Sequence, residues 1–296
     1  MKKLNIAVVW YFDKAKWVEP YWRDGHRAAF DILKKKHNVD FLLGTDFKLE
    51  DNYDFILLWD SSNSEFIPQL REYKAKKGLC LTTDLGINME NLHHFDVIFP
   101  EAEPVYQMIR NSGFRAIKAF GADTNFYTNE DTQVTKYFPA FYPATFSPWK
   151  RQDLYAEAVR DNGMALGTIQ PDGLFYYRKC IEYGVRTIVG YVPAETVRDF
   201  YRMSKVVVVP SWEGSGRTVL EAMAMDIPVI VTKDNHKAAS YMREAGVGEI
   251  VDPTPEALQK AFWKVMNKKV KTRDFILKNY SGEVFAEQLL KGIENG

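Results

Sequence analysis

The sequence predicts an α/β protein in which parallel sheets are covered by helices on both faces, in two domains. Segments typical of strands alternate with segments typical of helices along most of the chain, which is the pattern of βαβ units. With 296 residues and 46% hydrophobic content, the chain can bury two cores of ordinary size. A polar stretch without periodicity, residues 127–133, lies between two such halves. We therefore expect an N-terminal domain over residues 1–133 and a C-terminal domain over residues 134–280.

In the first domain, short apolar and β-branched runs predict strands, and amphipathic stretches between them predict helices. The expected strands are 4–10, 39–43, 54–58, 79–83, 96–99 and 115–119. The expected helices are 25–36, 64–76 and 102–112. The last of these ends at Ser112-Gly113, a typical helix C-terminus.

The second domain repeats the alternation. Its expected strands are 137–142, 163–168, 186–190, 205–209, 228–232 and 248–251. From residue 254 onward the pattern predicts two or three helices. The last, residues 281–293, has an apolar face that consists of Val284, Phe285, Leu289 and Leu290.

Charge and cysteine content disfavour several classes of protein. Lys plus Arg and Asp plus Glu are equal at 39 each, so bulk charge indicates neither a nucleic-acid domain nor a membrane domain. The two cysteines, Cys80 and Cys180, are far apart, which argues against a disulfide scaffold or a zinc site. The start of the chain does not resemble a signal peptide, and no apolar run approaches the roughly 20 residues that span a bilayer. We expect a cytoplasmic protein without a transmembrane segment.

Residues 211–224 place two carboxylates, a glycine-rich turn and a helix start close together. The turn contains Gly214, Ser215 and Gly216, and residues from Thr218 onward favour helix. Backbone N–H groups and the dipole at such a helix start attract anions, and glycine lets a diphosphate approach the backbone. Glu213 and Glu221 flank this turn, where carboxylates accept hydrogen bonds from sugar hydroxyls. The segment predicts a sugar-nucleotide site.

Each of these charged residues also has a plainer interpretation. Glu213 could cap the helix, and Glu221 could be a solvated helix residue. Arg217 either adds a guanidinium to the phosphate site or points to solvent.

The pattern Pro-Ser-x-Glu-Gly-x-Gly-x-x-x-Leu-Glu-Ala-Met-Ala over residues 210–224, followed by Ile227-Pro-Val-Ile-Val-Thr232, resembles a known signature. It is similar to that of the retaining glycosyltransferases of family 4, the glycosyl transferases group 1. The resemblance implies a GT-B fold, two Rossmann-like domains with parallel sheets facing across a cleft. In that fold the last helix, about residues 281–296, packs back on the first domain. Asp226 stands where the family usually has Gly, which affects the local turn.

The resemblance also implies roles for single residues. Glu213 would hold donor-sugar hydroxyls and Glu221 the ribose. Lys150 and Arg151 match the basic residues that hold the diphosphate, and Val192 lies in the segment near the base. The remaining implied donor-binding residues are Gly25, Ser215, Gly216, Arg217 and Thr218.

Catalysis by such an enzyme must stabilise charge that develops on the leaving phosphate. The chain contains no Asp-x-Asp motif, the metal-binding motif of the other common glycosyltransferase fold. We therefore expect Lys150, Arg151 and the helix start to replace a metal ion. No metal and no cofactor are expected beyond the nucleotide-diphospho-sugar co-substrate.

The acceptor side is expected in the first domain. Residues 10–26 form an aromatic-rich loop after the first strand, at the carboxyl edge where open α/β sheets bind ligands. Trp17, Tyr21 and Trp22 could stack on a sugar or nucleobase, or could cap the core. Asp84 either orients or deprotonates the acceptor as a catalytic residue, or caps the turn at Gly86. His26 is expected to contact acceptor or donor phosphate.

Three function classes remain open from the sequence. They are a glycosyltransferase of hexosyltransferase type, another GT-B nucleotide-sugar enzyme such as an epimerase, and a non-catalytic nucleotide-sugar or nucleic-acid binding protein. For a transferase, the acceptor could be a glycan, a lipid-linked sugar, a small molecule or a hydroxymethylated DNA base. The sequence leaves donor, stereochemistry and oligomeric state undecided.

Overall fold

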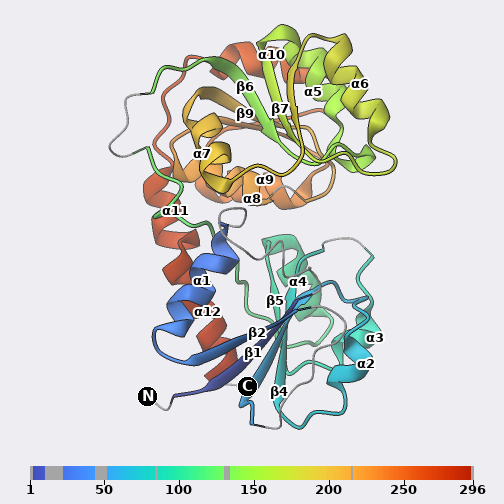
Figure 1. The fold of residues 1–296 in the computed structure, drawn as a ribbon, viewed down its shortest axis with the longest axis vertical. Helices are drawn as coiled ribbons and strands as arrows, with labels where there is room; N and C mark the ends of the chain where they lie inside the picture. Colours follow the sequence, from blue (N-terminus) through green and yellow to red (C-terminus); the bar gives the residue numbers. More distant parts are fainter. Residues whose placement is uncertain are drawn as a thin grey trace. The chain divides into compact units, whose positions relative to one another are not determined.

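The computed structural model describes residues 3–10, 23–43, 52–83, 86–129, 134–214 and 216–294. The chain separates into two compact units, Met1–Asp123 together with Tyr280–Gly296, and Thr124–Asn279. Each unit has its own sheet, in which all described strand pairs are parallel (Figure 1). These two parallel-sheet α/β units agree with the predicted fold class.

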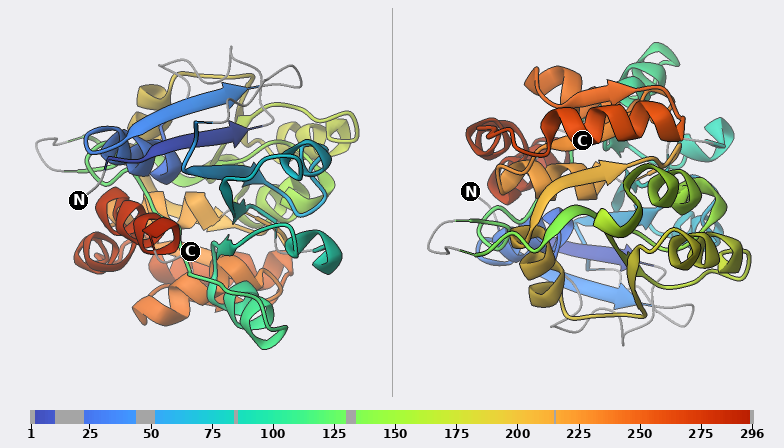
Figure 2. Two further views of the ribbon diagram at one scale, coloured as in Figure 1. Left: turned by 90° about the horizontal axis from the view of Figure 1, so that it is seen from below. Right: turned by 90° about the horizontal axis from the view of Figure 1, so that it is seen from above.

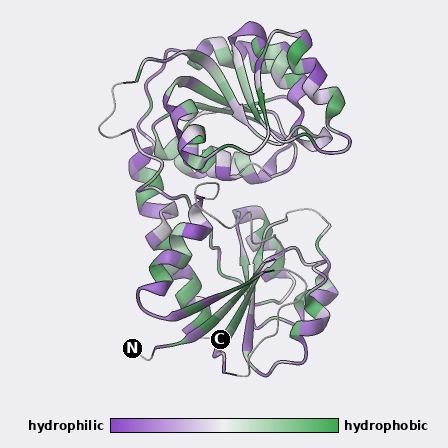
Figure 3. Ribbon diagram, viewed as in Figure 1, coloured by the Kyte–Doolittle hydropathy of each residue, from purple (hydrophilic) through white to green (hydrophobic). Residues whose placement is uncertain are grey.

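The first unit contains a sheet with the strand order β2-β1-β3-β4-β5. The strands are β1 Asn5–Trp10, β2 Asn38–Leu43, β3 Phe55–Asp60, β4 Lys76–Leu81 and β5 Val97–Pro100. In the register, Val8 of β1 lies opposite Phe41 on one side and Leu57 on the other. The central strands are nearly continuous apolar runs, as expected of strands covered on both faces (Figure 3).

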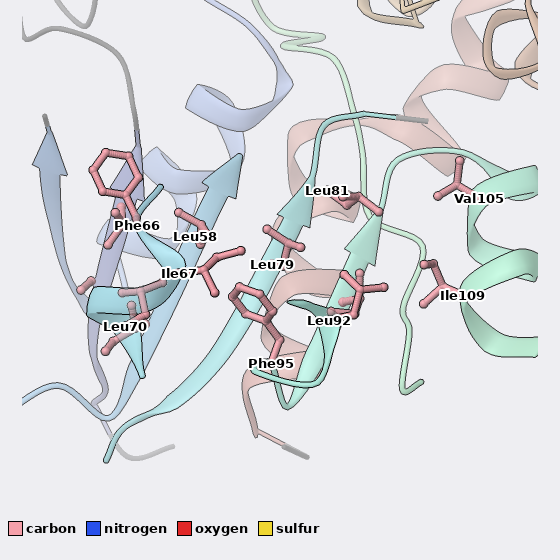
Figure 4. Packing of buried hydrophobic residues seen from close by; sticks show 14 residues of the cluster. Leu58, Phe66, Ile67, Leu70, Leu79, Leu81, Leu92, Phe95, Val105 and Ile109 are labelled. Atoms are coloured by element: carbon pink, nitrogen blue, oxygen red, sulfur yellow. The ribbon is translucent and has the colours of Figure 1, made fainter. Parts of the chain in front are cut away.

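Helices cover both faces of this sheet. On one face lie α2 Ile67–Leu70, α3 Met89–Leu92 and α4 Glu103–Asn111, and Figure 4 shows their apolar side chains beside Leu58, Leu79 and Leu81. On the other face α1, Gly25–Lys34, lies beside α12, Gly282–Glu294 (Figure 1). Gly282 allows this approach, because a Cβ there would lie 2.7 Å from the Cβ of Ala28.

The buried face of α12 differs in detail from the expected one. Phe285 and Leu289 are buried as expected, whereas Val284 and Leu290 are half-buried. Gly292 belongs to the buried face, and a Cβ there would lie 2.3 Å from the Phe99 ring of β5. The helix therefore packs closely on the sheet of the first unit.

The second unit contains a six-stranded sheet with the order β11-β10-β9-β6-β7-β8. The strands are β6 Phe138–Pro143, β7 Gly163–Gly167, β8 Arg186–Val189, β9 Ser204–Val209, β10 Val229–Thr232 and β11 Glu249–Val251. Read from β8, this is the doubly wound order in which two βαβαβ halves start from neighbouring central strands.

Helices lie on both sides of the second sheet (Figure 2). They are α5 Gln152–Val159, α6 Leu174–Glu182, α7 Ala194–Arg202, α8 Gly216–Ala224, α9 His236–Ala245, α10 Pro255–Val265 and α11 Arg273–Tyr280. The helix α5 packs against α6 and α10, and α8 packs against α9. Through α11 the chain returns to the first unit at Tyr280.

Two expected elements of the first unit were wrong. The helix expected at 64–76 is only the single turn α2, because the chain from Lys76 already pairs with β3 at Phe55. Strand pairing thus overrides local helix propensity. The strand expected at 115–119 is a single bridge between Ala116 and Ile98 of the short strand β5.

The backbone and hydrogen bonds of Asp226 explain why the chain has Asp, and not Gly, after α8. Its φ of 53° is in the left-handed region, which Asp tolerates better than most residues. Its Oδ1 accepts hydrogen bonds from the backbone N–H groups of Thr272, at 2.6 Å, and Arg273, at 2.8 Å. Asp226 therefore combines the turn with a cap on the first residues of α11.

Candidate functional site

The order of the second sheet reverses between β6 and β9. In open α/β sheets, ligands bind outside the carboxyl ends of the strands at such a point. The chain leaves β6 through residues 144–151 and leaves β9 through residues 210–215. These two segments carry the predicted residues Lys150, Arg151 and Glu213, and the second leads into α8.

The segment after β6 is held by the buried side chain of Gln152. Its Nε2 donates to the carbonyl oxygens of Ala144, at 3.3 Å, and Thr145, at 2.7 Å. Its Oε1 accepts from the Ser147 N–H at 3.3 Å. Arg151, in the left-handed region at φ 51°, then begins α5. The loop that positions Lys150 and Arg151 is therefore braced from within.

Lys150 joins the two segments. Its Nζ donates to the backbone carbonyl of Glu213 at 3.0 Å, and the Trp212 N–H donates to the Trp149 carbonyl at 3.1 Å. Gly214 has φ 68°, and a Cβ there would lie 2.8 Å from the Lys150 Nζ. Glycine at this position therefore serves both the turn and the space for the ammonium group.

Asn235 braces the segment after β9 from the neighbouring strand. Its Nδ2 donates to the Ser211 carbonyl at 2.9 Å and the Gly214 carbonyl at 3.1 Å. Its Oδ1 accepts from the Ala238 N–H at 2.9 Å, which caps α9. One buried amide thus ties the glycine turn to the start of a second helix.

The first turn of α8 is closely packed. A Cβ on Gly216 would lie 2.9 Å from Tyr241 Cε2 and 3.1 Å from Lys237 Cε, so this helix start needs glycine. Lys237 is 5% exposed, which places a buried lysine beside the helix start. Thr218 is buried and its Oγ1 donates to the Pro143 carbonyl at 3.5 Å. Arg217 is exposed, which fits both of its interpretations, so its role stays a prediction.

Glu221 lies inside the unit rather than in solvent. The residue is 4% exposed, and its Oε2 accepts a hydrogen bond from the Tyr201 hydroxyl at 3.0 Å. Burial and the charge of Glu221 raise the pKa of Tyr201 well above its ordinary value, so this hydroxyl stays a donor. The interpretation of Glu221 as a solvated helix residue is therefore wrong.

Arg151 makes an ion pair at the same edge of the sheet. Its Nη1 lies 2.7 Å from Oδ2 of Asp234, which follows β10. A guanidinium has five N–H donors, so this pair leaves capacity for further acceptors. Asp234 therefore orients Arg151 and leaves several N–H donors of the guanidinium for other acceptors.

Val192 lies at the carboxyl edge of the outer strand β8. It is half-buried, and it follows Gly190, which has φ 122°. The strand β7 lies between β8 and β6, so Val192 is one strand further from the switch point than Lys150. Its expected position near the base stays a prediction.

Gly25 and His26 belong to the first unit, at the start of α1. A Cβ on Gly25 would lie 1.9 Å from the Gly121 carbonyl oxygen, so backbone packing already requires glycine there. The His26 residue is 3% exposed, and its ring stacks on Trp59 with centroids 4.0 Å apart. Its edge contacts the Phe285 ring at 4.9 Å. His26 is thus an interior ring enclosed by aromatic neighbours, and its expected contact with acceptor or donor phosphate stays a prediction.

The remaining expected site residues lie outside the described part of the chain. They are Trp17, Tyr21, Trp22, Asp84 and Ser215. Their roles on the acceptor and donor sides stay predictions.

Sequence reasoning missed four residues of this site, namely Tyr201, Asp234, Asn235 and Lys237. Two of them had a usable signal, because Asp234 and Asn235 follow an apolar strand directly and asparagine is a preferred helix cap. Tyr201 and Lys237 lie on helices and reach the site only through tertiary packing.

Two further properties concern the described residues. Among them, no three His, Cys, Asp or Glu side chains form a group that could hold a metal ion. No helix in these ranges is long and apolar enough to cross a membrane.

Comparison with solved structures identifies the fold. A glycosyltransferase from Rickettsia africae ESF-5 superposes with a TM-score of 0.74 and 13% identity, over 100% of this chain and 99% of that one. The Anabaena protein HepE, solved in complex with UDP and glucose, gives 0.71 and 14% identity over 98% and 100%. A UDP-GlcNAc 2-epimerase from Methanocaldococcus jannaschii gives 0.60 and 11% over 99% and 100%.

No curated protein matches the sequence significantly. Residues 182–281, which contain the segment after β9 and all of α8, match the family model described as glycosyl transferases group 1. The fold of the chain is GT-B, and its segment 182–281 is similar to the glycosyl transferases group 1.

Proposed function

We propose that the protein is a glycosyltransferase that moves a sugar from a nucleotide-diphospho-sugar to a hydroxyl acceptor. One observation carries this proposal. The Lys150 ammonium group lies 3.0 Å from the Glu213 carbonyl at the switch point of the second sheet, beside the start of α8. This arrangement offers a cation, backbone N–H groups and carboxylates at one place. The family match over residues 182–281 supports the same conclusion.

In the proposed complex, the diphosphate lies at the start of α8. The N–H groups of the first helical turn and the helix dipole stabilise its negative charge. Lys150 adds a positive charge, and Arg151, held by Asp234, donates its remaining N–H groups. These groups bind the leaving diphosphate more tightly as charge develops on it, which lowers the barrier to transfer.

The two carboxylates bind the ribose and the sugar of the donor. Glu221, fixed by Tyr201, accepts hydrogen bonds from the ribose, and Glu213 accepts them from the donor sugar. The burial of Glu221 makes this interaction selective, because a buried acceptor discriminates strongly against a ligand that lacks the matching hydroxyl.

We further propose a retaining, metal-independent reaction that requires no cofactor. The leaving phosphate assists in deprotonating the acceptor on the same face of the sugar, so that no carboxylate nucleophile is required. The stabilising charges come from Lys150, Arg151 and the start of α8.

The proposal is tested with a panel of nucleotide sugars and purified full-length chain. UDP-sugars come first, since the HepE structure of the same fold holds UDP. A true donor raises the melting temperature, because it binds the folded state alone. Release of nucleoside diphosphate, with and without an acceptor, then measures transfer and hydrolysis. We expect this release to continue unchanged in EDTA.

The products separate the proposed function from its alternatives. Nuclear magnetic resonance of the glycosidic linkage should show retained anomeric configuration. A free epimerised nucleotide sugar would identify an epimerase instead, and tight donor binding without turnover would identify a binding protein. Loss of turnover in EDTA, with recovery in Mg²⁺ or Mn²⁺, would contradict metal independence.

A further inference from the structure

A cavity lies at the edge of the second sheet opposite the candidate donor site. It has a volume of about 400 Å³. Lys205 is the second residue of β9, Pro228 directly precedes β10, and Lys136 lies just before β6, so the cavity adjoins the amino ends of these strands. The candidate donor site adjoins their carboxyl ends. The two places are therefore separate within one unit.

Lysines dominate the charge of this cavity. Lys136, Lys205, Lys268 and Lys269 line it, and among the described residues that line it the only carboxylate is Asp226. The Oδ1 of Asp226 already accepts the hydrogen bonds that cap α11. Of the lysines, Lys268 has a long contact of 3.8 Å to Glu249, outside the cavity lining. The cavity thus carries a positive charge that its own carboxylate does not balance.

Burial also acts on the charge of one of these lysines. Although much of the Lys136 residue is open to solvent, burial lowers the pKa of its ammonium group. The surroundings therefore disfavour its charged form. A bound anion would reverse that effect, because an opposite charge within a few ångströms favours the protonated amine.

The other lining residues are largely apolar. Met266 and Val270 are half-buried and contribute hydrocarbon surface beside the lysines, whereas Ile227 and Pro228 are buried beneath it. A cavity with apolar walls and a few charged groups is typical of small-molecule sites, and its volume is near the lower end of their usual range of about 300–1,000 Å³. This composition fits a compact ligand with both an anionic group and an apolar ring, rather than a polymer backbone.

We propose that this cavity binds a small phosphorylated metabolite that carries a ring, at a site separate from the nucleotide sugar. The phosphate lies among the lysines, and the ring lies on the surface formed by Met266 and Val270. Because Asp226 also caps α11, a ligand here contacts the residue that links the end of α8 to the returning helix.

Phenyl phosphate is the probe, because it combines the two required parts. Its binding to the full chain is measured by isothermal titration calorimetry at low ionic strength. The double variant Lys268→Gln, Lys269→Gln should bind it at least about tenfold more weakly, since each lost charged hydrogen bond costs roughly this factor. Lys260→Gln, an exposed lysine of α10 outside the cavity, is the matched control and should bind like the wild type.

Two further measurements identify the place and the ligand class. Phenyl phosphate can also occupy the candidate donor site, so the titrations are repeated in a Lys150→Gln background. The loss caused by Lys268→Gln, Lys269→Gln should persist there, whether or not the chain transfers sugars. Inorganic phosphate should bind more weakly than phenyl phosphate, because it lacks a ring. Equal loss in Lys260→Gln, loss only in Lys150→Gln, or binding of duplex DNA without binding of phenyl phosphate would each overturn the proposal.

Discussion

The hydroxyl of Tyr201 donates a hydrogen bond to Oε2 of Glu221 across 3.0 Å, and both residues are buried. Tyr201 lies on α7 and Glu221 on α8, so the bond links two helices that flank β9. A carboxylate held in this way loses little further freedom when it binds a ligand, which favours tight binding. Tyr201 is therefore a positioning residue for the proposed ribose contact.

Replacing this tyrosine should reduce stability and donor affinity together. Tyr201→Phe keeps the ring but leaves the buried Glu221 carboxylate short of a donor, which should cost about 1–3 kcal/mol in the free energy of unfolding. Urea denaturation measures this change, and calorimetry measures nucleotide affinity. Tyr137→Phe, at a residue that is 63% exposed, is the control and should change neither quantity. If the two variants had the same stability and nucleotide affinity, Tyr201 would not be a positioning residue.

The same tyrosine predicts a loss of stability in alkaline solution. Burial and Glu221 raise the pKa of Tyr201 in the folded state, whereas in the unfolded chain it titrates near its ordinary value of about 10. Above that pH the unfolded chain binds fewer protons than the folded one, so stability falls as pH rises, by up to about 1.4 kcal/mol per unit. Stability curves from pH 8 to 11 should therefore fall less steeply for Tyr201→Phe than for the wild type. Parallel curves would contradict the assigned shift.

Substitutions of the two carboxylates of the donor site should have different effects on binding and turnover. Glu221→Ala should mainly weaken nucleoside diphosphate binding, because the ribose contact belongs to the bound nucleotide. Glu213→Ala should mainly lower kcat, because the donor sugar changes most in the transition state. Each lost hydrogen bond corresponds to about 1–3 kcal/mol. Full activity and unchanged donor affinity in both variants would show that neither carboxylate contacts the donor.

Asp226 should show a graded response to substitution. Asp226→Asn keeps an acceptor for the N–H groups of Thr272 and Arg273 and tolerates the left-handed backbone, so its cost should be smallest. Asp226→Gly loses the cap but relieves the backbone. Asp226→Ala loses the cap and keeps the strain, so it should be the least stable, by about 1–3 kcal/mol relative to the wild type. Chemical denaturation orders the three variants, and an alanine variant as stable as the asparagine variant would contradict this account.

Local sequence was sufficient to predict the strands of the second unit. The apolar runs of β9 before Pro210 and of β10 after Pro228 lack the 3.6-residue periodicity of an amphipathic helix. The segment 211–224 also predicted the turn and α8, because glycine and helix-forming residues act over a few positions. The parallel α/β fold class followed from the same alternation.

The limits of this prediction follow from contacts between distant residues. Lys76 joins a strand because Phe55 of β3 offers hydrogen bonds, although its own neighbours favour helix. His26 is interior because Trp59 and Phe285, far away in sequence, enclose its ring. Neither outcome could be read from the residues adjacent in the chain.

The fold class, the elements of the second sheet and the segments that carry Lys150, Glu213 and Glu221 follow from the amino-acid sequence alone, because they depend on local periodicity and spacing. Which side chains meet depends on the packing of these segments in three dimensions. The pairs Lys150 with Glu213, Arg151 with Asp234 and Tyr201 with Glu221 join segments 20 to 83 positions apart. Such pairs form because strand order and helix packing bring their segments to one edge of a sheet, and burial then requires each polar group to find a partner.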